Sequence, residues 1–213
     1  MYPSPTAPER YADGMVHALS LVAFFIAGAF LLPVAAAQGD PKLVSATAIY
    51  VTAILASISI SGAYHLLPHH HMRKTLQRWD HAAIYTLIAG TFSPLLVLSD
   101  TTSAYVILAV VWFFAFAGVL FKVFGTNIEA KWSLASYLGL GWFGLFALPD
   151  FWDALPTSAL VALGSGGLFY TVGTLFYKSK SLSFRYPIWH FFGLLGGSSF
   201  FAAIWISLAN ASS

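Results

Sequence analysis

The polar side chains best suited to chemistry in this sequence stand at the ends of long apolar stretches. His65 closes the second stretch, Asp80 opens the third, and His190 opens the seventh. A charged or imidazole group at membrane depth is costly, so its presence in an apolar segment indicates a functional site. Neutral imidazole nitrogens and carboxylate oxygens are good zinc ligands. The three residues together predict a metal site, provided that the fold brings them to one depth.

Two further polar residues accompany them. Ser61 precedes His65 by four residues, which places both on one face of a helix. His17 stands at the start of the first apolar stretch. A catalytic zinc typically keeps three protein ligands and one water, and a nearby hydroxyl such as that of Ser61 orients a ligand or the water. The alternative is that each histidine is only an interfacial group hydrogen-bonded to water or carbonyls. Composition and topology leave both interpretations open.

The elements that position these residues are transmembrane helices. The chain has 213 residues, of which 58% are hydrophobic and 8% charged, whereas soluble chains carry about 25% charged residues. We expect an all-α fold, a seven-transmembrane helix bundle over residues 16–209, with tails at 1–15 and 210–213. The absence of cysteine excludes disulfides, thiolate nucleophiles and cysteine-ligated zinc. The expected spans are 16–33, 44–64, 80–98, 103–124, 132–148, 157–177 and 187–208.

Basic residues in the short loops predict the orientation, because Lys and Arg are retained on the cytoplasmic side. We expect the N-terminus in the cytoplasm, the C-terminus outside and an odd number of spans. His65, Asp80 and His190 then share the cytoplasmic end. Lys42 alone falls on the outer side. The remaining basic residues fall on the cytoplasmic side: Arg10, Arg73, Lys74, Arg78, Lys122, Lys131, Lys178, Lys180 and Arg185.

Four sequence motifs resemble one known family. SGAYHLL at 61–67 is similar to its Ser-x3-His motif, and RWDHAAIYTLIAGTFSPLLV at 78–97 to its Asp-His motif. YTVGTLFY at 170–177 and PIWHFFGLLG at 187–196 resemble its last two spans. The chain therefore resembles the hemolysin III family, the bacterial branch of the progestin and adipoQ receptor superfamily. The likeness covers nearly the whole chain, and the motifs keep their order.

This resemblance implies a zinc site near the cytoplasmic face. The superfamily's ligands match His65 and His190, with Asp80 taking part directly or through water. The remaining family histidine falls on Tyr186, whose neutral phenol is a poor zinc ligand, so the resemblance implies a zinc site that is weaker, recruits Asp80 directly or is empty. His17 is a substitute if the first helix packs beside the seventh. Likeness to alkaline ceramidases implies a zinc-dependent lipid amide hydrolase, with Asp80 and Ser61 as catalytic residues.

Three functions remain open at this stage. The first is a cell-membrane protein of lipid and fluidity homeostasis with a hydrolase-like zinc site and membrane lipids as partners. The second is a non-catalytic membrane sensor or regulator with a structural or degenerate metal site, which the Tyr186 departure favours. The third, cytolytic or ion-conducting activity, rests only on the family name. The net charge of +2 is no signal of nucleic-acid binding, and the oligomeric state stays open.

Overall fold

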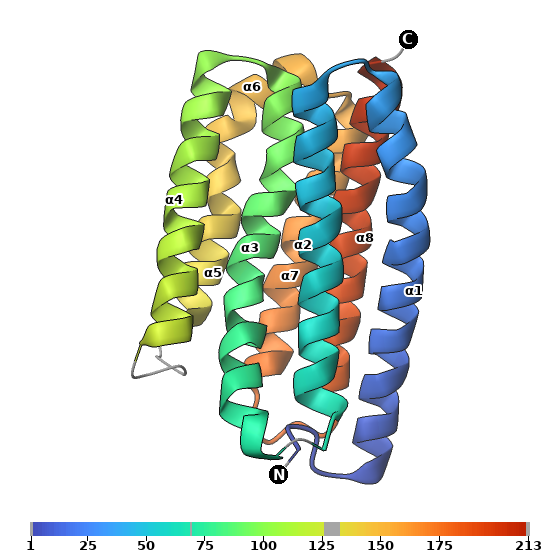
Figure 1. Ribbon diagram of the computed structural model, residues 1–213, viewed down its shortest axis with the longest axis vertical. Helices are drawn as coiled ribbons and strands as arrows, with labels where there is room; N and C mark the ends of the chain where they lie inside the picture. The colour runs from blue at the N-terminus through green and yellow to red at the C-terminus, as the bar shows by residue number, and fades with distance from the viewer. Residues whose placement is uncertain (1, 69, 126–132, 212–213) are drawn as a thin grey trace.

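Long helical segments run side by side along the computed structural model (Figure 1). It describes residues 2–68, 70–125 and 133–211, apart from the side chain of His70. Lys131 and the expected start of the fifth span at residue 132 lie outside these ranges. The elements are α1 (Ala7–Ala37), α2 (Pro41–Leu66), η1 (His70–Met72), α3 (Arg73–Ser99), α4 (Thr102–Phe124), α5 (Ser133–Trp142), η2 (Phe143–Ala147), α6 (Leu148–Ala154), α7 (Thr157–Lys178) and α8 (Arg185–Ala211).

The all-α fold and the number of spans predicted from sequence are confirmed. Within the described ranges, seven helical segments are long and apolar enough to cross a membrane, and α5, η2 and α6 together form one of them. Helices satisfy their own backbone hydrogen bonds, which lipid cannot do, so this is the form expected of the apolar segments. The two ends of the chain lie at opposite ends of the bundle (Figure 1), as an odd number of crossings requires.

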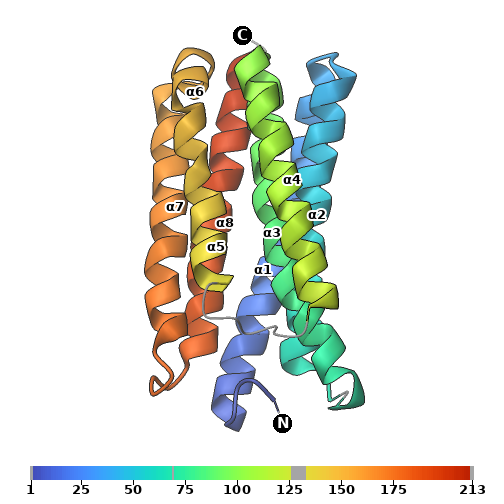
Figure 2. The ribbon, with the colours of Figure 1, turned by 90° about the vertical axis from the view of Figure 1, so that its left-hand side faces the viewer.

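The spatial order of the helices brings the first span beside the last. α7 and α8 form a hairpin, and α1 contacts both α2 and α8 (Figures 1 and 2). α3 is the most enclosed helix and contacts α2, α4 and α8, while α4 keeps Phe113 and Phe116 exposed on its outer face. Apolar side chains on that face suit a lipid surrounding. The adjacency of α1 and α8 is the arrangement that allows His17 to take part in the site.

α1 begins at Ala7 and not near residue 16. The Thr6 hydroxyl accepts a hydrogen bond from the Glu9 backbone N–H, and the Glu9 carboxylate accepts one from the Thr6 backbone N–H. This capping box satisfies backbone donors that the first turn of a helix otherwise leaves open. Residues 7–13, which the sequence analysis assigned to an N-terminal tail, therefore belong to the first helix.

Two other spans also differ from their expected bounds. α3 begins at Arg73, so Asp80 lies about two turns inside the helix and not at its start. The span expected at 132–148 is interrupted by the 3-10 turn η2 and continues as α6 to Ala154. Pro149 stands in the first turn of α6, where its missing N–H costs nothing.

Glycine allows α7 and α8 to approach closely. A Cβ on Gly196 would lie 2.5 Å from the ring of Tyr170 and 3.2 Å from the carbonyl oxygen of Gly166. A Cβ on Gly193, in the same helix, would meet nothing within 4 Å. Small residues at helix contacts are the usual means of tight packing in membranes. This packing fixes α8, and with it His190, relative to its neighbours.

Candidate metal centre

One face of α1 carries a row of buried polar residues. Glu9, Asp13 and His17 follow one another at intervals of four residues, and Ser20 continues the row. This spacing puts all of them on the same side of the helix. Asp13 is fully buried, with 0% of its surface exposed. A buried carboxylate needs hydrogen-bonding partners, and the first helix directs this one towards α2 and α8.

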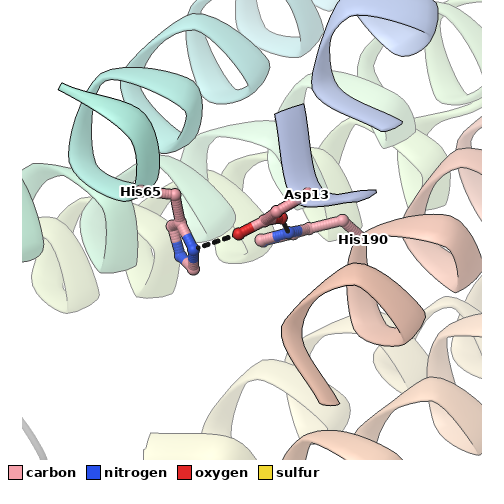
Figure 3. Close-up of side chains that lie close together, drawn as sticks. All are labelled: Asp13, His65 and His190. Carbon is pink, nitrogen blue, oxygen red and sulfur yellow. Dashed lines mark hydrogen bonds and ion pairs between the residues drawn. The ribbon is translucent and has the colours of Figure 1, made fainter. Parts of the chain in front are cut away.

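The carboxylate of Asp13 joins two histidines from distant parts of the chain. Its Oδ2 lies 2.9 Å from Nδ1 of His65 on α2, and its Oδ1 lies 2.6 Å from Nδ1 of His190 on α8. Figure 3 shows both imidazoles directed at this carboxylate. One ligand atom from each of the three residues lies within 4.8 Å of the others. Asp13, His65 and His190 therefore form a buried cluster that can hold a metal ion.

His17 and Ser61 extend this cluster. His17 Nδ1 lies 2.8 Å from the backbone oxygen of Asp13, and its Nε2 lies 3.2 Å from the Ser61 hydroxyl. The same hydroxyl lies 3.5 Å from Nε2 of His190. The rings of His17, His65 and His190 have centroids 4.3–5.7 Å apart. Three imidazoles thus surround one carboxylate, with a hydroxyl between two of them.

The hydrogen-bonding pattern determines which histidine nitrogens are available. An ionised carboxylate only accepts hydrogen bonds, as does the Asp13 carbonyl that His17 contacts. Each neutral imidazole therefore places its hydrogen on Nδ1, and Nε2 keeps a lone pair. His17 uses that lone pair to accept from Ser61. The Nε2 atoms of His65 and His190 carry no hydrogen, which is the state in which a histidine nitrogen binds zinc.

This donor set fits zinc in two coordination modes. In one, the Asp13 carboxylate binds the ion directly with two histidines, a ligand set seen in catalytic zinc sites. In the other, the Nε2 atoms bind the ion and Asp13 holds their Nδ1–H groups, as carboxylates behind metal-bound histidines commonly do. Imidazole donors favour zinc and other transition metals over Mg²⁺ and Ca²⁺, which select oxygen ligands.

The N-terminal segment covers the cluster. Ser4, which is 1% exposed, donates a hydrogen bond of 2.9 Å to Oδ2 of Asp13. Arg10 donates to the backbone oxygen of Pro5 at 2.9 Å and so holds the segment against α1. The Tyr2 ring lies 5.0 Å from the guanidinium of Arg10, a cation–π contact that holds the start of the segment in place. The cluster is thereby enclosed at the N-terminal end of the bundle.

The structure brings three of the site residues proposed from sequence together and leaves the fourth apart. His65 and His190 meet in the cluster, and Ser61 contacts His190. Among the described residues, Asp80 is not part of the group of close ligand atoms; it is half-buried on α3, near enough to interact electrostatically with His17.

Tyr186, at the position where the resemblance has a histidine, does lie beside the cluster. Its ring packs edge-on against the imidazole of His65, with centroids 5.0 Å apart. Its hydroxyl accepts a hydrogen bond of 2.7 Å from Arg185. The phenol oxygen is thus engaged by a cation, which suits it poorly as a ligand for a second cation. Among the described residues, the carboxylate in the group of close ligand atoms is that of Asp13, where the sequence had pointed to Asp80.

Asp13 was missed because it precedes the first long apolar run. The sequence did carry a signal for it: an acid, an acid and a histidine at four-residue intervals, Glu9, Asp13 and His17. That spacing is typical of one helix face, and it continues in phase with the apolar positions Phe24 and Leu31, which are also buried. This spacing indicates that the part of the expected tail from Glu9 onward is the start of the first helix.

Comparison with known proteins confirms the family resemblance found in the sequence. The profile of a family described as Haemolysin-III related matches residues 8–201. The chain is 34% identical to the Hemolysin-3 homolog of Bacillus subtilis (strain 168), with 91% of each chain covered. It is 30% identical to Hemolysin-3 of Bacillus cereus, covering 96% of this chain and 94% of the relative. It is 26% identical to the human Monocyte to macrophage differentiation factor, covering 94% and 85%.

Proposed function

Because the chain belongs to the Haemolysin-III related family of seven-span membrane proteins, we propose that it is a zinc-dependent enzyme of membrane-lipid homeostasis that hydrolyses a lipid amide. The observation that supports this proposal is the buried cluster of Asp13, His65 and His190. Ionisable groups at membrane depth are costly, so three of them in contact favour a functional role. In the proposed orientation the N-terminus is cytoplasmic, and the cluster faces the cytoplasmic leaflet of the cell membrane.

The proposed reaction adds water to the amide carbonyl and breaks the C–N bond, which releases a fatty acid and an amine. When bound, zinc supplies Lewis acidity that polarises a carbonyl and lowers the pKa of water. His65, His190 and Asp13 hold the ion in this proposal. Asp80 takes the proton of the attacking water and returns it to the departing amine. The Ser61 hydroxyl, which donates to His17 Nε2 in the structure, turns its hydrogen to the carbonyl oxygen as negative charge develops there. These last two roles are proposals from the family resemblance.

The experiment that tests the metal centre compares two aspartates near the same end of the bundle. Zinc is measured by mass spectrometry in the purified parent and in Asp13→Asn and Asp80→Asn. We expect about one zinc per chain in the parent, little in Asp13→Asn, and parental content in Asp80→Asn. His65→Ala and His190→Ala should also lose zinc. Zinc lost from Asp80→Asn but kept in Asp13→Asn would contradict the ligand set proposed here.

Catalysis needs a separate test. The parent and Asp80→Asn, both loaded with zinc, are incubated in vesicles containing a ceramide, and the released fatty acid is measured by mass spectrometry. We expect release by the parent and a loss of at least about 100-fold in the variant, since general acid–base catalysis typically contributes 10²–10⁴-fold. No release by zinc-loaded parent protein would remove the hydrolase proposal and leave the metal centre intact.

A non-catalytic regulator with a structural metal is the second candidate. The observation that favours it is the enclosure of the cluster: Ser4 and Asp13 are 1% and 0% exposed, and the Tyr186 phenol is tied to Arg185. In this case zinc stabilises the packing of α1 against α2 and α8. Removal of zinc from the parent then lowers its melting temperature, while no turnover is measurable.

A cytolytic function has less support. The relatives carry the name Hemolysin-3, but the space between these helices is filled by an apolar core that includes Tyr50, Leu95 and Ile204. A wide aqueous channel needs a polar lining. Dye-filled liposomes reconstituted with the protein should show background leakage only, and leakage that rises with protein content would reinstate this function.

A further inference from the structure

A small pocket lies directly beside the metal centre. It has a volume of about 150 Å³ and is lined by the N-terminal segment, by the first residues of α8 and by the loop that precedes α8. We call it the basic vestibule; its polar lining residues are Ser4, Glu9, Lys180, Arg185 and Tyr186. Pockets for whole drug-sized ligands measure about 300–1,000 Å³. The basic vestibule is therefore the size for one small polar group of a larger molecule.

The two cations of this pocket outnumber its one carboxylate. In the part of the chain that the structure describes, neither Lys180 nor Arg185 forms an ion pair with a carboxylate. Glu9 also lines the pocket, but its Oε1 accepts from the backbone N–H of Phe184 at 2.9 Å and its Oε2 accepts from Thr6 at 2.8 Å. Glu9 thus anchors the loop and keeps its negative charge, so the two cations leave the pocket with a net excess of one positive charge.

The guanidinium of Arg185 is held in place but keeps free donors. It lies 4.4 Å from the ring centroid of Tyr186 and spends one hydrogen bond on the Tyr186 hydroxyl. A guanidinium has five N–H donors, so several remain for a ligand. Arginine in such a fixed position binds phosphate through paired hydrogen bonds, and lysine adds a point charge. The lining chemistry matches a phosphate group better than a neutral headgroup.

Two lining residues connect this pocket to the metal centre. Ser4 donates to Asp13, and the Tyr186 ring packs against His65. A group bound in the basic vestibule is thus separated from the cluster by a single side chain. We propose that the basic vestibule binds the phosphate of an anionic phospholipid, Lys180 and Arg185 being its ligands. An anionic phospholipid such as phosphatidylglycerol carries ester bonds and no amide, so we place it here as a bound lipid and not as the substrate of the neighbouring site. Its binding does not rest on the proposed function.

The test is a binding measurement with matched variants. The parent, the double variant Lys180→Ala/Arg185→Ala and the control Lys74→Ala/Lys178→Ala are purified in neutral detergent. Lys74 and Lys178 are exposed and lie near the same end of the bundle, but do not line the pocket. Phosphatidylglycerol and phosphatidylcholine are titrated separately, and bound lipid is counted by native mass spectrometry. Zinc content is measured in the same samples.

We expect the parent to prefer phosphatidylglycerol, and the pocket variant to bind it at least about tenfold more weakly, because two charge-assisted hydrogen bonds are lost. The control variant should change less than about threefold. Equal weakening in both double variants would mean general surface attraction and would overturn the proposal. Lys180→Ala alone, in an exposed loop, repeats the test should the double variant fail to fold.

A second arm separates lipid from soluble phosphate. Glycerol 3-phosphate is titrated by calorimetry into the parent and the pocket variant. Binding of glycerol 3-phosphate as tight as that of the lipid would overturn the lipid assignment. Lipid binding that far exceeds it supports the lipid. If the purified parent holds no zinc but binds phosphatidylglycerol, the zinc enzyme is refuted and the lipid site in the basic vestibule stands. If the parent holds zinc but shows no preference for phosphatidylglycerol, only the lipid site is refuted.

Discussion

Removal of the Asp13 carboxylate should destabilise the bundle more than any change to an exposed acid. In Asp13→Ala, three buried donors lose their acceptor: the hydroxyl of Ser4 and the Nδ1–H groups of His65 and His190. An unsatisfied buried donor costs about 1–3 kcal/mol, and breaking a buried charged pair costs about 3–5 kcal/mol. We take about 3–5 kcal/mol for the whole change, since imidazoles can exchange tautomers. At about 2–4 °C per kcal/mol for a chain of this size, the melting temperature falls by about 6–20 °C.

The assay is thermal unfolding in one detergent, followed by tryptophan fluorescence, with a chelator present so that metal binding contributes nothing. Asp153→Ala is the control, because Asp153 is an exposed acid, and exposed substitutions usually change stability by less than about 0.5 kcal/mol. Equal melting temperatures for the two variants would refute the reasoning, since they would mean that the carboxylate does not hold α1 to α2 and α8.

Three further outcomes concern packing and hydrogen bonds. Gly196→Ala should lower the melting temperature, because its Cβ would overlap the Tyr170 ring, whereas Gly193→Ala should leave it unchanged or higher, since alanine favours a helix by about 1 kcal/mol; equal effects would contradict the close packing. Arg78→Met should destabilise by about 1–3 kcal/mol in denaturant unfolding, because Arg78 donates to three carbonyls at the end of α4; a parental unfolding curve would show these bonds to be dispensable. Ser61→Ala should weaken zinc binding about 10–100-fold in competition with a chelating dye, since residues that orient metal ligands contribute this much; an affinity within twofold of the parent would exclude that role.

The fold was predictable because its signal is local. Each span is an apolar run long enough to cross lipid, and its helical form follows from the backbone's need for internal hydrogen bonds. His65 and His190 were also predictable as site residues, because an imidazole stands out at the end of an apolar run. Whether they meet depends on the order of helices around the bundle. The resemblance implied that His65 and His190 share a zinc site, but the order of the helices was not contained in the apolar pattern.

Asp13 was not predictable from hydropathy because its partners lie far along the chain. Windowed hydropathy assigns Glu9, Arg10 and Asp13 to water, since each is charged. In the fold, Asp13 is buried against His65 of α2 and His190 of α8, and Glu9 takes part in the capping box that begins α1. The ends of helices are the least certain part of any sequence-based prediction. Here the early start of α1 places Asp13 in the candidate metal centre. The role of Asp80 stays a prediction.

The distance along the chain between Asp13 and His190 has a consequence for how the protein is made. These hydrogen-bonded residues are 177 positions apart, so at 5–20 residues per second Asp13 leaves the ribosome about 10–35 s before its partner. Of the two helices that flank α1 in the finished bundle, only α2 is made in this interval, and the carboxylate has a single histidine from another helix, His65. A chain that stops before α8 exposes half of a polar cluster to lipid. Insertion of the last helix therefore completes both the bundle and the polar cluster.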